Sequence, residues 1–367
     1  MKSFTAFGDD LYTGRRSYRV VQRRRFWYAV SAGLVLLSVL SLLTLRLNPG
    51  IEFRGGSEFR VPGVTDTSSA IAEQAVEEAL PDGGTPRVST VGTSSVRVQT
   101  EPLDQEGEER VSAALADGYG VSADDVSSSS VGPSWGDDVT RQALIGLFTF
   151  LVLAALVLAA YFRTWRMSAA AMTALVHDVV ITVGIYSVTG LEVTPSTVIG
   201  FLTILGYSLY DTVVVFDKIR ENTAHVLSSS RLTYAESVNL AVNQTLVRSI
   251  NTTVVALLPV AAILFVGALL LGAGTLQDIA VALFVGMLAG AYSSVFLAPA
   301  LYTQLMERRP DVAEHTARVL AARADGSAAR ASGAARATST TVSGSLLGAG
   351  SAAGAGSAAT AVLERDG

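Results

Sequence analysis

The chain has 367 residues, of which 50% are hydrophobic and only 16% are charged, with a mean hydropathy of +0.42 and a formal net charge of −5. Soluble domains carry roughly 25% charged residues, so this composition indicates a membrane protein and argues against a simple soluble enzyme. The lack of cysteine excludes a disulfide framework, a thiolate metal centre and a cysteine nucleophile. Neither lysine follows a glycine, so the Gly-Lys-Ser/Thr of a P-loop is absent and the sequence predicts no ATP site of its own.

Six apolar runs are long enough to cross a bilayer, which takes about 20 helical residues. The first run predicts transmembrane helix 1 at 26–46, and the other five predict helices 2–6 within 139–307. No Ala-x-Ala cleavage site follows the first run, so we expect a retained anchor and not a secretory signal. The fold class predicted is an α-helical polytopic membrane protein.

Basic residues mark one side of these six runs. Arginines cluster in the segment 1–25, and Arg163, Arg166, Lys218 and Arg308 lie in or beside the connections of the same side. The short connections on the opposite side, at 190–195 and 272–277, carry no Arg or Lys. Because Arg and Lys are retained on the cytoplasmic side, both termini are predicted to be cytoplasmic and residues 47–138 extracytoplasmic.

The segment 47–138 has the patterning of a small α+β domain. Alternation predicts strands at 51–53, 57–61 and 121–131 and a hairpin from 87–91 and 95–100, whereas helical spacing predicts helices at 67–80 and 104–119. Strands interleaved with two helices favour a ferredoxin-like, split βαβ arrangement.

The segment 308–367 is rich in Ala, Gly and Ser and is predicted to be a disordered cytoplasmic tail, because few of its side chains could offset the entropy of ordering. The stretch 312–336 is expected to be transiently helical at most.

Two charges lie deep in the predicted bundle. Asp211 is about 9 Å inside the fourth helix, and Arg248 lies at a similar depth in the fifth, so the two are expected to be electrostatic partners. An ion pair that only pins two helices and a protonation switch both remain open. A polar stripe is expected along the fifth helix, from Asn243, Gln244, Arg248, Asn251 and Thr252.

His177 and Asp178 lie about 15 Å inside the third helix. As neighbours in a helix they project about 100° apart, so we do not expect both to face one partner. Each is interpreted either as a polar group that faces the bundle or as part of a proton relay.

Five segments together resemble the SecF subunit family of the bacterial SecD–SecF accessory complex of the protein-export channel. They are Ile-Glu-Phe-Arg-Gly-Gly-Ser at 51–57, Val-Gly-Pro-Ser-Trp-Gly at 131–136, Ala-Leu-Val-His-Asp-Val at 174–179, the stretch from Gly-Tyr-Ser-Leu-Tyr-Asp to Glu-Asn at 206–222, and Asn-Gln-Thr-Leu-Val-Arg-Ser at 243–249.

The resemblance implies a half-transporter of the resistance–nodulation–division type in the bacterial plasma membrane, without an enzymatic activity or a cofactor. It implies a SecD-like partner, a SecYEG-type channel, an unfolded preprotein and membrane lipid as partners, and no nucleic acid. Members of the family use the proton motive force to help complete translocation after the SecA ATP-driven step. The family's proton-conducting Asp and Arg would correspond to Asp211 and Arg248, and its Gly-Gly pair to Gly55 and Gly56 at the junction of membrane and outer domain.

The chain departs from the usual family pattern at four positions. Glu52 and Ser57 replace Asp and Thr, Trp135 replaces a smaller apolar residue, and Tyr210 replaces the Asn before the fourth-helix Asp. Tyr210 is expected to alter the hydrogen bonding around Asp211.

Two other functions compete with proton-coupled export. One is a non-conducting scaffold of the translocon, and the other is an exporter of small molecules or lipids. An intramembrane enzyme ranks last, because neither His-Glu-x-x-His nor Gly-x-Ser-x-Gly occurs.

Overall fold

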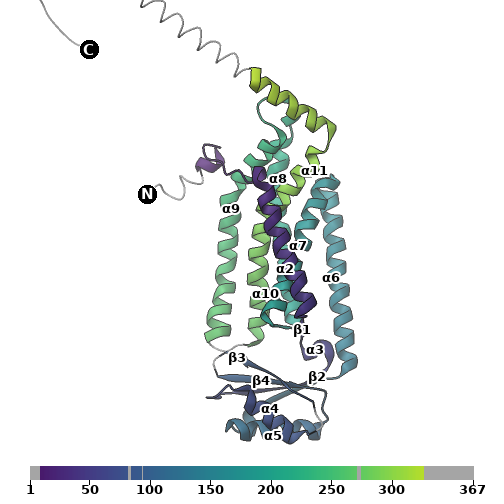
Figure 1. Cartoon of the computed structure of the whole chain (residues 1–367), viewed down its shortest axis with the longest axis vertical. Coiled ribbons are helices and arrows are strands. Elements are labelled where there is room, and N and C mark those ends of the chain that lie inside the picture. Colours follow the sequence, from purple (N-terminus) through teal and green to yellow (C-terminus); the bar gives the residue numbers. More distant parts are fainter. Residues whose placement is uncertain (1–8, 82–83, 93, 271–273, 326–367) are drawn as a thin grey trace, which may run out of the picture.

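The computed structural model describes residues 9–81, 84–92, 94–270 and 274–325. Within these residues, six helical segments are long and apolar enough to cross a membrane, and a small sheet domain lies at one end of their bundle (Figure 1). The predicted fold class is therefore confirmed. Both described ends of the chain lie at the opposite end of the bundle, called here the basic end because Arg23, Arg163, Lys218 and Arg308 lie there.

The spans follow one another along the chain with short connections. They are built from η1 (Val21–Arg23) and α2 (Arg24–Thr44), α6 (Pro133–Phe162), α7 (Trp165–Thr189), α8 (Pro195–Thr223) with η3 (Val226–Ser228), α9 (Tyr234–Ala262) with the π-helical η4 (Ile263–Leu270), and α10 (Gly274–Tyr292) with the π-helical η5 (Ser293–Leu297) and α11 (Ala298–Glu307). Capping boxes at Thr194 and Thr233 satisfy the first backbone N–H groups of α8 and α9.

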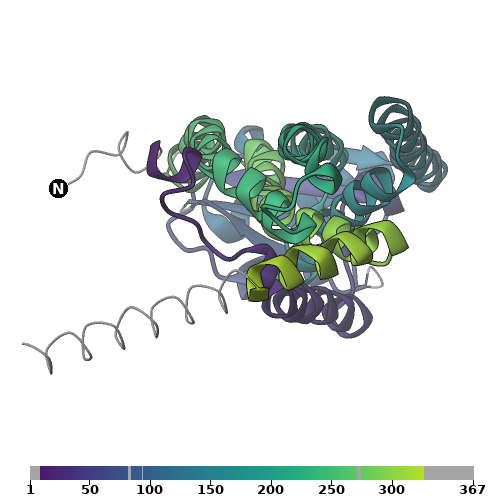
Figure 2. The ribbon, with the colours of Figure 1, turned by 90° about the horizontal axis from the view of Figure 1, so that it is seen from above.

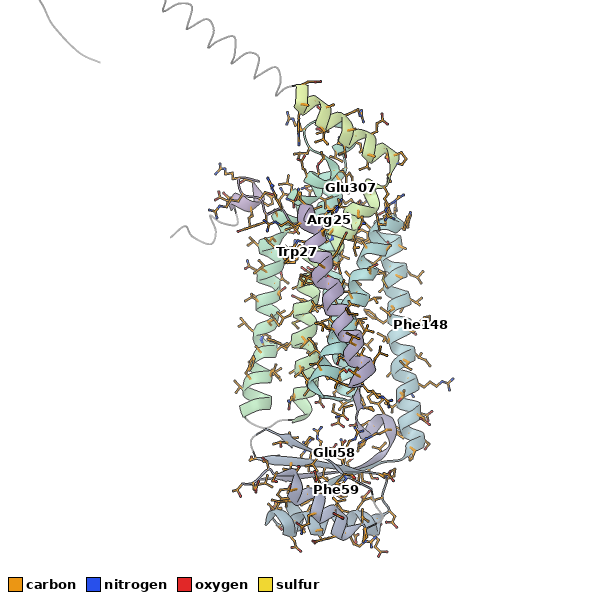
Figure 3. The ribbon with its side chains drawn as sticks, in the orientation of Figure 1. Arg25, Trp27, Glu58, Phe59, Phe148 and Glu307 are labelled. Atoms are coloured by element: carbon orange, nitrogen blue, oxygen red, sulfur yellow. The ribbon has the colours of Figure 1, made fainter. Side chains whose placement is uncertain are left out.

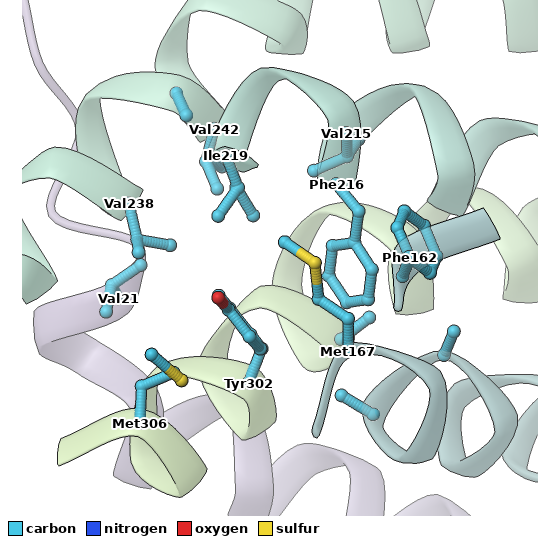
Figure 4. Close-up of a cluster of buried hydrophobic side chains, with 14 of the residues drawn as sticks. Val21, Phe162, Met167, Val215, Phe216, Ile219, Val238, Val242, Tyr302 and Met306 are labelled. Carbon is cyan, nitrogen blue, oxygen red and sulfur yellow. The ribbon is translucent and has the colours of Figure 1, made fainter. Parts of the chain in front are cut away.

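Small residues bring the helices of the bundle close together. A Cβ at Gly286 of α10 would lie 2.5 Å from the Ile204 side chain of α8, and a Cβ at Gly184 of α7 would lie 2.2 Å from Ser38 of α2. Such close approach is typical of membrane helices, where packing and not the hydrophobic effect holds helices together. At the basic end, Phe216, Tyr302 and Met167 belong to a buried cluster to which all six spans contribute (Figure 4).

The sheet domain consists of β2 (Gly56–Pro62), α4 (Ser69–Ala79), β3 (Arg87–Val91), β4 (Ser95–Thr100), α5 (Gln105–Tyr119) and β5 (Ser127–Val131). Its antiparallel sheet has the order β3-β4-β2-β5, which is the predicted ferredoxin-like arrangement. Successive side chains of a strand alternate between faces. Phe59 and Val98 are therefore buried against α4 and α5, whereas Glu58 and Arg97 face the bundle (Figure 3).

The prediction of a strand at 51–53 is wrong, because Ile51–Arg54 forms the helical turn α3. The turn ends where Gly55 and Gly56 take φ values of 79° and 144°, and only then does the strand begin. The last strand is also shorter than the predicted 121–131, because η2 (Ala123–Asp125) precedes β5. A two-residue parallel pair, β1 (Asn48–Pro49) with β6 (Glu192–Val193), ties the first span's exit to the loop between α7 and α8.

The prediction of disorder from residue 308 onward is wrong for residues 310–325, which form a helix. Figure 2 shows it lying across the basic end of the bundle. Val312, His315 and Val319 recur at helical spacing and are buried, so this segment has an apolar face that the average composition of the tail conceals. The rest of the predicted tail, 326–367, lies outside the described residues.

Candidate functional site

Two buried carboxylates lie inside the membrane bundle. Asp178 of α7 is 1% exposed and Asp211 of α8 is 5% exposed, and within the described parts of the six spans no other acidic side chain is buried. A charged group costs about 2.5–3.5 kcal/mol at the centre of a membrane helix, so each carboxylate requires polar partners. The structure supplies these partners as serine hydroxyls.

Asp178 receives hydrogen bonds from two other membrane segments. The Ser208 hydroxyl of α8 donates to Oδ2 of Asp178 at 2.6 Å, and the Ser293 hydroxyl of η5 donates to the same oxygen at 2.7 Å. The other oxygen, Oδ1, lies 3.1 Å from Nδ1 of His177. Three segments of the bundle therefore meet at one carboxylate.

His177 contacts the neighbouring Asp178 directly. Neighbouring side chains start about 100° apart on the helix, but the imidazole is long enough to bend back onto the carboxylate of Asp178. The ring also stacks on Tyr292, with centroids 6.0 Å apart, and its Nε2 is buried without a hydrogen-bond partner among the described residues. The two side chains therefore contact each other, while the further partners of each are different residues.

Asp211 is held in the same manner. The Ser249 hydroxyl of α9 donates to Oδ1 at 2.9 Å, and the Ser294 hydroxyl of η5 donates to Oδ2. Ser293 and Ser294 are adjacent in η5, so one segment reaches both carboxylates. The site is thus a carboxylate–serine network, defined by Asp178, Asp211, Ser208, Ser249, Ser293 and Ser294.

Arg248 does not pair with Asp211, which corrects the predicted partnership. Its side chain is exposed, and no ion pair joins it to Asp211 in the described structure. Ser249 occupies the inward face of α9, so the residue before it turns about 100° away. Tyr210 is also turned outward, with 56% of its surface exposed, and it does not share the hydrogen bonds of Asp211.

Arg248 instead lines a polar cavity of about 340 Å³ at the basic end. The other lining residues are Tyr12, Val214, Asp217, Lys218, Glu221, Gln244 and Thr245. Val214 lies three residues from Asp211, and Thr245 lies four residues from Ser249, so the cavity begins about one helical turn from the network. Arg248 therefore lines a cavity about one turn from the network and does not contact Asp211 itself.

The side chains of the predicted polar stripe of α9 have different partners. The Asn243 side chain accepts a hydrogen bond from the backbone N–H of Tyr18 at 2.7 Å and donates one to the Tyr18 carbonyl at 2.9 Å. The Gln244 side chain donates to the carbonyl of Tyr12. Both amides hold the segment that precedes the first span. Asn251 is exposed. These side chains do not form one continuous path.

The serines of the network were missed by the sequence reasoning. Ser249 follows Arg248 directly in the noted stripe, and Ser293 and Ser294 are a polar pair in an otherwise apolar run. Polar pairs in such a run were the signal that could have identified them. Among the described residues, no group of three or more His, Asp or Glu side chains is placed to hold a metal ion.

A second polar cluster joins the sheet domain to the bundle. Arg97 of β4 is 7% exposed and donates to Glu192 of β6 at 2.5 Å, while its Nε lies 3.4 Å from Glu58 of β2. Gln99 donates to both Glu192 and Glu58, at 2.5 and 3.0 Å. Burial raises the pKa of nearby Glu52, and the negative charges of Glu192 and Glu58 raise it further.

Gly55 and Gly56 form the corner between the sheet domain and the second span. A Cβ at Gly55 would lie 2.9 Å from Cα of Pro133, the first residue of α6, and a Cβ at Gly56 would lie 2.6 Å from the carbonyl oxygen of Thr100. Both residues also have positive φ values, which larger residues rarely adopt. The pair thus allows β2 to leave α3 directly beside the start of α6.

The protein has a six-span bundle and a ferredoxin-like domain that follows the first span. Its hydrogen-bonded carboxylates lie deep in the bundle, so it is a polytopic membrane protein with a polar intramembrane site. A sequence model described as "Protein export membrane protein SecD/SecF, C-terminal" matches residues 111–308, and a second, "SecD/SecF GG Motif", matches residues 40–63. The chain belongs to the SecD/SecF family of protein export membrane proteins.

Named relatives agree with this family. The chain is 47% identical to "Protein translocase subunit SecF" of Streptomyces coelicolor over 89% of this chain and 87% of the relative, and 41% identical to the subunit of the same name from Mycobacterium tuberculosis over 88% and 75%. A crystal structure of SecDF from Thermus thermophilus, described as a translocon-associated membrane protein, matches with a TM-score of 0.71 at 30% identity. That match covers 80% of this chain but only 39% of the SecDF chain.

Proposed function

We propose that this chain is a SecF-type subunit of the preprotein translocase, which pairs with a SecD-like subunit and uses the proton motive force to help complete translocation after the SecA ATP-driven step. The observation that carries the proposal is the carboxylate–serine network, because ionisable groups held at membrane depth are a usual component of proton relays. The proposed location is the bacterial plasma membrane, with the basic end cytoplasmic and the sheet domain outside.

Asp211 is the proposed proton acceptor. Its two serine donors stabilise the charged form, and the polar cavity lined by Arg248 gives protons and water an approach from the basic end. Protonation would add an O–H donor to the carboxyl group, which a serine hydroxyl could rotate to accept, while the other oxygen would continue to accept a hydrogen bond. Arg248 is proposed to act from the wall of this cavity and not as a direct partner of Asp211.

The pairing with a SecD-like subunit is supported by the relatives in which the two are one chain. The Thermus thermophilus relative named "Protein translocase subunit SecDF" matches this chain over only 38% of its own length. The rest of that relative is long enough to hold the SecD-like part. A SecYEG-type channel, an unfolded preprotein and membrane lipid are the further proposed partners. The subunit is proposed to have no catalytic activity of its own.

Asp211→Asn tests the proposal. In cells we expect slower release of a secreted reporter in a pulse–chase, and in inverted vesicles loss of the export-linked proton flux, with SecA ATP hydrolysis unchanged. Asp137→Asn is the matched control, because Asp137 is exposed near the start of α6 and belongs neither to the network nor to the lining of the polar cavity. Ser294→Ala should weaken the flux less than Asp211→Asn.

The outcome of the Asp211 test separates the alternatives. Wild-type export and wild-type proton flux in Asp211→Asn would refute a proton-coupled role. Unchanged flux together with unchanged export would favour the non-conducting scaffold, whereas unchanged export with the flux abolished would show that proton movement through Asp211 does not drive export. Purification of this chain as a homodimer without a distinct six-span partner, under conditions that preserve the channel, would favour a small-molecule or lipid exporter.

A further inference from the structure

We propose that the groove between α2, α9 and η5 binds one anionic phospholipid of the leaflet at the basic end. A cavity of about 620 Å³ opens there, lined by Arg19, Arg23 and Trp27 together with side chains of α9 and η5. A second cavity of about 330 Å³ continues it deeper along α9. The two share Leu246, Ile250 and Phe296, so they form one continuous groove.

The charge at the mouth of the groove favours an anionic headgroup. Arg19 and Arg23 are four residues apart in a helical turn and so lie on one face, and the lining of this cavity includes no acidic residue. Neither arginine forms an ion pair within the described residues, in contrast to Arg24, which pairs with Glu307. Two uncompensated arginines at the membrane interface attract a lipid phosphate.

The deeper part of the groove suits an acyl chain. Its lining is almost entirely apolar and runs along α9 from Leu246 to Leu257, which at 1.5 Å per residue is about 17 Å. One leaflet of a bilayer core is about 15 Å thick, so the groove is as long as the hydrocarbon part of one leaflet. Tyr292 and Phe296 lie along the side of the groove formed by α10 and η5.

The order of the two parts of the groove matches a phospholipid. Arg19 and Arg23 lie at one end, and the apolar lining continues from there along α9, as a headgroup joined to an extended hydrocarbon chain requires.

Trp27 provides a direct probe of this site, because it lines the groove at the end of α2 nearest the two arginines (Figure 3). The chain has three tryptophans, and the other two, Trp135 and Trp165, are 63% and 65% exposed. In a Trp135→Phe/Trp165→Phe background, Trp27 fluorescence then reports which lipid contacts the groove. Lipids with brominated acyl chains quench tryptophan on contact.

The experiment reconstitutes this variant into phosphatidylcholine vesicles with increasing mole fractions of either brominated phosphatidylglycerol or brominated phosphatidylcholine. We expect the anionic lipid to reach half-maximal quenching at a mole fraction at least about fivefold lower, since one arginine near a surface contributes roughly that factor. Arg19→Gln/Arg23→Gln should remove the preference. Arg15→Gln/Arg25→Gln, which changes the charge equally but does not line the groove, should retain it.

A groove-filling variant tests the acyl-chain part of the site separately. Ala291→Leu adds volume to the wall of the deeper cavity without changing a charge, so it should reduce the extent of quenching by phosphatidylglycerol. Equal quenching by the two lipids, or a preference that persists in Arg19→Gln/Arg23→Gln, would overturn the proposal. Loss of quenching by both lipids when the SecD-like subunit is co-reconstituted would show that a partner helix occupies the groove instead. Glycerol phosphate, which lacks acyl chains, should not relieve the quenching; relief by it would assign the site to a soluble phosphate.

Discussion

Replacement of Arg97 by methionine should release the sheet domain from the bundle. Arg97 is the cation between Glu192 and Glu58, and its side chain and that of Glu192 are only 8% and 9% exposed. Removal of one partner from a buried ion pair costs about 3–5 kcal/mol, because the other charge is left buried and unpaired. At the lower limit, about 3 kcal/mol, the equilibrium between docked and released domain shifts about a hundredfold.

Hydrogen–deuterium exchange measures this shift. The Gly50 N–H donates to the Val193 carbonyl at 2.9 Å, in the pairing of β1 with β6 that Arg97 and Glu192 stabilise. If opening of the junction limits exchange, protection of the Gly50 amide should fall about a hundredfold in Arg97→Met. Arg110→Met is the control, because Arg110 is exposed on α5, away from the bundle.

A double variant separates charge pairing from loss of packing. Glu192→Gln removes the unpaired carboxylate that Arg97→Met creates, so Arg97→Met/Glu192→Gln should recover part of the protection lost in Arg97→Met. The single Glu192→Gln change should be milder, since Arg97 keeps Glu58 as a partner. Gly50 exchange equal to that of the wild type in Arg97→Met, or strictly additive losses in the double variant, would refute the reasoning.

Two further changes test the junction and the bundle. Burial raises the pKa of Glu52, so the stability that its proton contributes is present below its ordinary pKa and is lost as the pH rises through the raised value. Glu52→Gln should therefore have a higher Tm than the wild type at pH 7 and an equal Tm at pH 4. A lower Tm at pH 7 would contradict this. Glu58→Gln, which weakens a contact of Arg97, should lower the Tm at pH 7. Gly286→Ala should lower the Tm by a few degrees, because the added Cβ would collide with the adjacent helix α8. At Gly206 an added Cβ would meet no heavy atom within 4 Å, so Gly206→Ala should leave the Tm unchanged or raise it. Equal effects of the two variants would refute the packing argument.

The spans and the order of elements in the sheet domain were predictable from the sequence for a simple physical reason. A bilayer imposes a minimum apolar length, and alternation or helical spacing is visible where one face is buried. The segment 51–54 is too short to distinguish strand alternation from helical spacing. Its helical turn depends on Gly55 and on contact with α6. Similarly, residues 310–325 are ordered by three buried side chains that bulk composition averages away.

The partners of the buried carboxylates were harder to predict, because depth alone does not fix a partner. Sequence spacing placed Arg248 at the depth of Asp211, and the rotation of α9 about its own axis decides whether residue 248 or 249 points inward. That rotation is set by packing on distant segments, including the hydrogen bonds of Asn239 and Asn243 to residues 17–21. A one-residue difference therefore replaced an ion pair with a serine hydrogen bond.

The two carboxylates are not independent, because both are bound by the five-residue segment η5. The Ser294 hydroxyl donates to Oδ2 of a charged Asp211, and on protonation of that oxygen it could rotate to accept the new O–H instead. Ser293 is the next residue and donates to Asp178, so a backbone shift in η5 that suits one carboxylate changes the geometry at the other. π-helical turns inside α-helices often occur at functional sites, and here such a turn carries the two adjacent serines that donate to the two carboxylates. In the proposed function, a rearrangement of the hydrogen bond between Ser294 and Asp211 on protonation would reach Asp178 of α7 through the neighbouring Ser293.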